Sequence, residues 1–187
     1  MLRYNFNKNL YKPQKGGDIM YKKGEYVVKV NDGICRIEDI VKMGAETLKT
    51  GRLYYLMVPE HEKKARFYVP VENENGHLRK IMTEKEAWAF IDNIPYIDAA
   101  LIPDEKTREK KYKEALQSGN PVQLISIIKN IYIRKNERIS QGKKNTAVDE
   151  RYFKLAEETL YAELAFATGS KKEEMPQVIE ARIKDKE

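Results

Sequence analysis

The side chains in this chain that could do chemistry are mostly cations, and they gather in two blocks of the C-terminal half. The first block is Lys106, Arg108, Lys110, Lys111 and Lys113, which outnumber Glu105, Glu109 and Glu114. The second block is Lys129, Arg134, Lys135, Arg138, Lys143 and Lys144, with Glu137 as a counter-charge. Clustered lysine and arginine can bind phosphate groups, although a solvated helix face has the same composition. The pattern favours a binding chemistry with an anionic partner.

Residue patterns that would support an enzyme are weak. His61 and His77 are expected on loops without a partner at metal-ligand spacing, and neither Ser118 nor Ser140 has a neighbouring base. The sequence also contains no glycine-rich phosphate-binding loop. We therefore predict no catalytic residue, no metal site and no cofactor.

The first half of the chain has the composition and spacing of about five short strands. Glu25–Val30 and Ile34–Ile40 flank Asn31-Asp32-Gly33, where glycine can take a positive φ and the Asx side chains can bond the nearby backbone. This pattern predicts a hairpin. The later expected strands are Arg52–Val58, Ala65–Val69 and Gly76–Arg79, the first two of which end at Pro59 and Pro70.

Almost everything after Met82 has helical signals. Thr83–Glu86 has the spacing of a capping box, and Asn120 followed by Pro121 is a typical helix start. A longer helix is expected over about Ala147–Ala167 because Gly169 provides a stop. The apolar contacts of this last helix are expected to come from Tyr152, Leu155, Leu160, Leu164 and Phe166.

The order of several short segments resembles one protein family over roughly residues 20–170. These segments are Tyr21–Val28, Asn31–Gly33, Tyr54-Tyr55, Tyr68–Pro70, Gly76–Arg79, Lys111–Lys113, Ser118-Gly119, Ile127–Asn130, Glu137–Ser140 and Ala162–Leu164. Each segment is a weak signal alone, but their order and spacing resemble the CarD-like (CdnL) bacterial transcription regulators. The resemblance implies an α+β fold with a small Tudor-like five-stranded β-barrel followed by an all-helical domain.

The resemblance also implies a division of labour between the two halves. Residues 20–82 would be a Tudor-like domain that docks on the β subunit of RNA polymerase, and residues 83–187 would be a helical domain that binds promoter DNA. The positions that match the family's docking surface are Lys42, Met43, Arg66, Phe67 and Tyr68. The family often places arginines where this chain has Met43 and Tyr68, so Lys42 and Arg66 are the candidate substitutes, while burial statistics favour a core role for Phe67.

In the helical half, the family places a tryptophan wedge at the upstream edge of the open promoter bubble, just before a basic segment. Aligned on Lys110–Lys113, that position is Arg108 in this chain, which departs from the family pattern. Arginine can enter a minor groove or stack on a base, but it lacks the rigid surface of indole. The only tryptophan, Trp88, is expected in the core. The DNA-binding residues implied are Arg108, Lys110, Lys111, Lys113, Lys135 and Arg138.

The composition suits a globular protein of one or two small domains without a membrane span. Of the 187 residues, 41% are hydrophobic and 34% charged, and no run of 18 apolar residues occurs. Cys35 is the only cysteine, which excludes an internal disulfide and suits a reducing cytoplasm. Because it lies on an expected strand, we predict a buried, inert thiol. The sequence does not predict an oligomeric state.

The first 19 residues differ from the rest and are expected to be a leader. Lys15–Met20 can be encoded by a purine-rich stretch of the kind that serves as a bacterial ribosome-binding site, so we expect native translation to start at Met20. Residues 1–19 supply half of the formal net charge of +6. The distribution of charge is therefore better evidence for nucleic-acid binding than its total.

Two other functions remain open on the sequence. The chain could be a protein-interaction adaptor whose basic helical domain binds RNA or an acidic protein. It could also be a hydrolase with an unrecognised site. Dependence of DNA binding on polymerase would separate the regulator from the adaptor, and metal-dependent turnover of nucleic acid would indicate the hydrolase.

Overall fold

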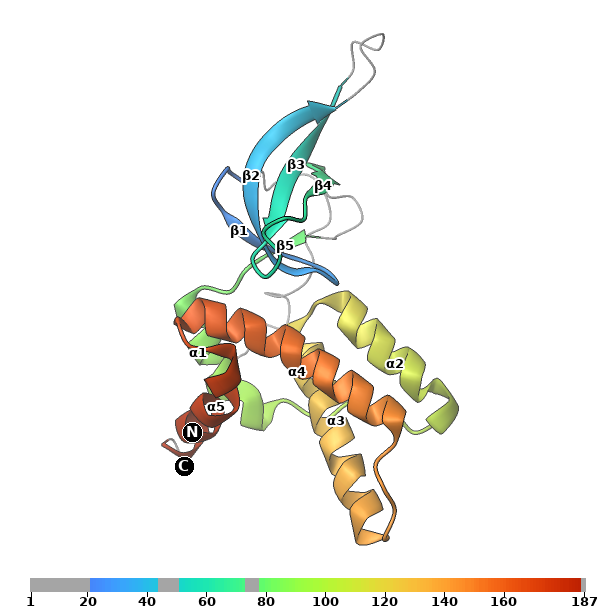
Figure 1. Ribbon diagram of the computed structural model, residues 1–187. Coiled ribbons are helices and arrows are strands. Elements are labelled where there is room, and N and C mark those ends of the chain that lie inside the picture. Colours follow the sequence, from blue (N-terminus) through green and yellow to red (C-terminus); the bar gives the residue numbers. More distant parts are fainter. Residues whose placement is uncertain (1–20, 44–50, 73–77, 186–187) are drawn as a thin grey trace. The chain divides into compact units, whose positions relative to one another are not determined.

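The computed structural model describes residues 21–43, 51–72 and 78–185, and these fall into two compact units that divide between Ile81 and Met82 (Figure 1). The N-terminal unit is a β-sheet and the C-terminal unit is entirely helical. The expected leader and start at Met20 lie outside the described residues, as does His77. The architecture is α+β, as the sequence predicted.

The strand unit is a five-stranded antiparallel sheet in the order β4-β3-β2-β1-β5. Its strands are β1 (Tyr26–Lys29), β2 (Gly33–Met43), β3 (Arg52–Pro59), β4 (Phe67–Pro70) and β5 (Leu78–Lys80). Within the described residues β4 and β5 each pair with one strand only, so the expected barrel is open and β4 is an edge. The edge strand is four residues long and ends at Pro70, which has no N–H for a ladder.

The predicted hairpin is confirmed. Tyr26 in β1 pairs with Arg36 in β2, and Lys29 pairs with Gly33. The turn needs the left-handed backbone conformation at Asn31 (φ 72°) and Gly33 (φ 77°), which asparagine and glycine adopt at least cost.

Burial on one face of the sheet makes a small core. Its fully buried members are Val27, Cys35, Ile37, Tyr55, Met57 and Leu78. The backbone N–H of Tyr21 donates to the Tyr55 hydroxyl at 2.9 Å, which satisfies the polar end of a buried ring. Cys35 is fully buried, as predicted, and burial raises the pKa of its thiol to about 11.

The described part of the helical unit contains five α-helices and two short 3₁₀ turns. They are α1 (Glu84–Asn93), η1 (Ile94–Tyr96), α2 (Glu105–Ser118), α3 (Pro121–Ser140), α4 (Ala147–Thr168), η2 (Lys172–Glu174) and α5 (Met175–Lys184). The predicted start signals are confirmed, because Thr83 and Glu86 form a reciprocal capping box and Asn120 caps α3. Gly169 ends α4 in the left-handed conformation.

The helices share one hydrophobic core. Its largest fully buried side chains are Phe90, Ile91, Tyr112, Leu124, Ile131, Leu160, Leu164 and Met175. Trp88 is half-buried against this core, where its ring lies under the guanidinium of Arg182. The expected core contacts of Leu155 and Phe166 are wrong, since both side chains are exposed on α4. None of the helices in the described part of the chain combines the length and apolar composition that crossing a lipid bilayer requires.

Candidate functional site

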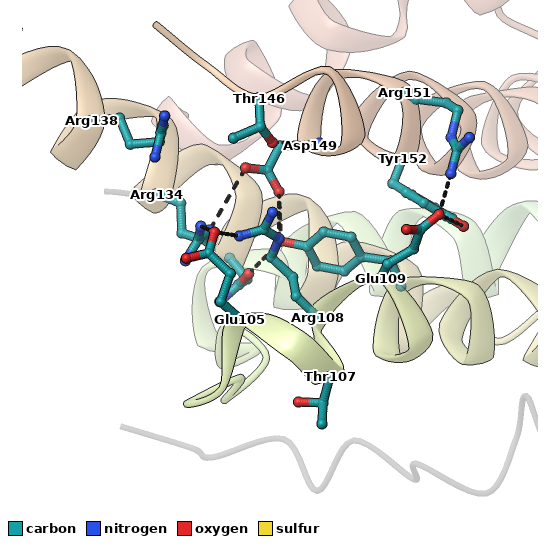
Figure 2. A network of polar contacts seen from close by, with 12 residues as sticks. Glu105, Thr107, Arg108, Glu109, Arg134, Arg138, Thr146, Asp149, Arg151 and Tyr152 are labelled. Carbon is teal, nitrogen blue, oxygen red and sulfur yellow. Dashed lines mark hydrogen bonds and ion pairs between the residues drawn. The ribbon is translucent and has the colours of Figure 1, made fainter. Parts of the chain in front are cut away.

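A network of charged side chains joins the first turns of α2 and α4 to the middle of α3 (Figure 2). Arg108 of α2 is at its centre, with a side chain only 9% exposed. Its Nη1 donates to Glu105, and its Nε lies 3.2 Å from Oδ1 of Asp149. The position that the family resemblance gave to a DNA wedge is therefore a buried, internally paired cation in this chain.

Asp149 is the inner anion of this network. It is fully buried in the first turn of α4, where its backbone N–H donates to the N-cap hydroxyl of Thr146. Its carboxylate also lies 3.8 Å from Nε of Arg134 and accepts a hydrogen bond from Tyr112. A buried carboxylate with two guanidinium groups and a phenol is compensated from three sides.

Tyr112 ties the same network to the core. Its hydroxyl lies 3.0 Å from Oδ1 of Asn130 and 3.3 Å from Oδ1 of Asp149. Burial, and next the charge of Asp149, raise the pKa of Tyr112 well above its usual value. The phenol is therefore a neutral donor at physiological pH, and it fixes α2 against α3 and α4.

The lysines of α2 have the opposite environment. Lys110, Lys111 and Lys113 are exposed, and Lys110 has a side chain 77% open to solvent. Glu114 is the acidic neighbour of two of them, with its carboxylate 3.1 Å from Lys111 and 4.0 Å from Lys110. Exposed pairs of this kind are screened and exchange readily with other anions. These three ammonium groups are thus available to an anionic ligand.

The two predicted residues of α3 differ from each other. Lys135 is exposed, whereas Arg138 is half-buried and donates through Nε to the backbone carbonyl of Lys144 at 2.9 Å. Arg138 therefore closes the turn between α3 and α4. Of the six residues predicted to bind DNA, the structure leaves Lys110, Lys111, Lys113 and Lys135 open, and it occupies Arg108 and Arg138 with internal partners.

In the strand unit, four of the five predicted docking residues are exposed, namely Lys42, Met43, Arg66 and Tyr68. Tyr68 is 51% exposed in β4, and Arg66 immediately precedes the strand. The guanidinium of Arg66 donates to the carbonyls of Lys63 and Ala65, and its Nε lies 3.6 Å from Glu38. Met43, at the end of β2, is also exposed.

Phe67 is the exception among the five residues. Phe67 alternates with Tyr68 along β4, packs half-buried against the strand core and has Nζ of Lys29 4.6 Å from its ring centroid. The side chain of Lys42 lies close to the backbone of Gly51, where an added Cβ on Gly51 would be 2.6 Å from Cε of Lys42. Phe67 therefore contributes to the strand core, whereas its neighbour Tyr68 is exposed.

The described residues hold no group of three His, Cys, Asp or Glu side chains arranged to bind a metal ion. The members of the charged network that the sequence did not predict as site residues are Glu105, Arg134 and Asp149. Two signals were present: the spacing of Thr146 and Asp149, which is that of an N-cap with an acidic third residue, and the three-residue spacing of Glu105 and Arg108.

Comparison with protein families assigns both units. The CarD-like/TRCF RID domain matches residues 21–82, and the CarD C-terminal domain matches residues 102–180. The chain belongs to the CarD-like family. Its open five-stranded sheet is the Tudor-like RID domain of that family. No curated protein matches the chain significantly.

Membership has a functional meaning that both matches share. A CarD-like protein is a transcription-associated factor, and the family is associated with RNA polymerase in general. Arg108 lies in the internal charged network of this chain.

Proposed function

We propose that this CarD-like protein is a bacterial, cytoplasmic, non-enzymatic transcription regulator that docks on the β subunit of RNA polymerase and contacts promoter DNA, stabilising the open complex. Residues 20–82 would be the docking domain and residues 83–187 the DNA-binding domain. The observation that carries the proposal is the presence of both CarD-type domains, in this order, in one chain.

The docking half of the proposal is supported by the edge strand. Among the residues that the structure describes, β4 pairs with β3 only, and an unpaired edge can accept a strand from another protein. Tyr68 and Arg66 lie at this edge with Met43 as a further exposed apolar side chain. An aromatic side chain and an arginine are the residue types that most often dominate the energy of a protein interface. In this proposal Phe67 supports the strand from the core side, and Lys42 contributes charge.

The DNA half of the proposal is supported by the open lysines. Lys110, Lys111 and Lys113 present three ammonium groups on α2, and Lys135 adds a fourth on α3. Contacts with phosphates give affinity and orientation without reading sequence, so binding by the helical unit alone would be weak. Docking on polymerase raises the local concentration of DNA and makes a weak contact effective. Arg138, which closes the turn between α3 and α4, then acts by positioning these helices.

The test is binding of the full chain to the isolated lobe of the polymerase β subunit, with Arg66→Glu as the variant. Lys64→Glu is the matched control, because it makes the same charge change at an exposed residue that is not among the predicted docking residues. We expect saturable binding that Arg66→Glu weakens at least tenfold and Lys64→Glu leaves within twofold. No binding at high micromolar concentration would reject the docking proposal and favour an adaptor of other partners.

A further inference from the structure

A single exposed carboxylate covers two guanidinium groups from different helices. Nη1 of Arg108 donates to Oε1 of Glu105, and Nη2 of Arg134 lies 3.3 Å from the same oxygen. The Glu105 side chain is 67% exposed, whereas both arginines are largely buried. Figure 2 shows the carboxylate of Glu105 against the two guanidinium groups.

The two carboxylates of this network are not equivalent. Asp149 is fully buried and contacts both arginines from the inside, so its removal would take away their buried counter-charge. Glu105 faces water, where screening makes an ion pair a small contribution to stability. Asp149 is therefore a fixed part of the network, whereas another anion can replace the carboxylate of Glu105.

The place occupied by Glu105 strongly favours negative charge. The pKa of Glu105 is lowered first by the hydrogen bond from Arg108, then by the charges of Arg108 and Arg134, and Arg138 adds a smaller effect in the same direction. Guanidinium groups form directed paired hydrogen bonds with carboxylates and phosphates alike. A phosphate that displaced Glu105 would meet the same donors and keep the charge of the network compensated.

We propose that Glu105 occupies an anion site formed by Arg108 and Arg134, and that a backbone phosphate of a bound nucleic acid takes this site when Glu105 swings into solvent. Glu105 is then an internal competitor that weakens nucleic-acid binding. The inference rests on the proposed DNA contact, and it adds to the α2 lysines a phosphate position at the junction of α2 and α3.

The test compares Glu105→Gln with Glu180→Gln in the full chain. Glu180 is a similarly exposed glutamate, paired with Lys184 on α5. Its change alters the net charge by the same amount, on a helix that carries no member of the network. Affinity for a short DNA duplex is measured against salt concentration by fluorescence anisotropy. We expect Glu105→Gln to bind several-fold more tightly, with a slope of log affinity against log salt more negative by about 0.9 for one added phosphate. The same slope in both variants would overturn the proposal.

A second change links the gain to the site. Arg134→Gln added to Glu105→Gln should remove the gain, and a retained gain would reject the two-arginine site. Thermal unfolding of each variant checks the fold, and Glu105→Ala repeats the experiment with a different side chain.

A titration with inorganic pyrophosphate tests the anion site separately from the proposed DNA binding. The arginine Nε–H signals are followed by NMR during the titration. If wild-type and Glu105→Gln protein bind DNA with the same slope of log affinity against log salt, the proposed function stands and the phosphate site is rejected. Pyrophosphate binding by Glu105→Gln without any DNA binding would keep an anion site but reject nucleic acid as its ligand. If pyrophosphate does not shift the arginine Nε–H signals of the Glu105→Gln protein, the anion site itself is rejected.

Discussion

Two arginines that were predicted to bind partners, Arg108 of the helical unit and Arg66 of the strand unit, are held in opposite ways. Arg108 in the helical unit is buried between Glu105 and Asp149, while Arg66 in the strand unit is exposed beside the β4 edge and bonds carbonyls of its own turn. The family resemblance predicted that both residues bind a partner. The difference teaches that position relative to a core, rather than residue type, decides whether a cation supports the fold or remains available to a partner.

The largest expected effect tests the buried side of this comparison. Asp149→Ala removes the inner anion and leaves Arg108 and Arg134 without their buried counter-charge, so we expect the helical unit to lose about 3–5 kcal/mol of unfolding free energy. Urea unfolding followed by the fluorescence of Trp88, the only tryptophan, reports this unit directly. Glu150→Ala, at the exposed neighbouring residue, should change the value by less than about 0.5 kcal/mol. Equal effects of the two changes would contradict a structural role for the network.

The next effect compares neighbouring residues of the strand edge. Phe67→Ala removes a half-buried ring from the strand core, and we expect a loss of about 2 kcal/mol, below the range for a fully buried ring. Tyr68→Ala removes an exposed ring and should stay within about 0.5 kcal/mol while weakening polymerase binding. Hydrogen exchange of β3 amides measures the stability of the unit. A larger loss for Tyr68→Ala would reverse the assignment of the two rings.

The smallest effect concerns the open lysines of α2. Lys110→Gln should make the slope of log DNA affinity against log salt less negative by about 0.9, since one phosphate contact is lost. Lys154→Gln is a close control, because Lys154 is also 77% exposed and also pairs with a glutamate four residues later, but on α4. The measurement is anisotropy with a duplex over a range of salt. A slope that changes equally in both variants would mean that only net charge matters.

Local signals predicted the elements well. The Asn31-Asp32-Gly33 turn, the capping box at Thr83 and the Asn120 cap each depend on residues close in sequence, and each is present in the structure. Each requires only neighbouring backbone groups to be satisfied. Such features can be predicted without knowledge of tertiary packing.

The charged network could not be predicted in the same way. Arg108 and Asp149 are 41 positions apart by their numbering, and only the packing of α2 against α4 brings them together. The exposed Leu155 and Phe166 were misplaced for the same reason, because a helical pattern does not reveal how wide the contact face of α4 is. On the strand edge, alternation separated Phe67 from Tyr68 once the register was known.

The most direct test of the account is the affinity of the full chain for promoter DNA with and without RNA polymerase. We predict weak, salt-sensitive binding alone and much tighter binding with polymerase, because docking raises the local DNA concentration. Arg66→Glu should remove the increase and leave the polymerase-free affinity unchanged. An affinity that is the same with and without polymerase would contradict the account.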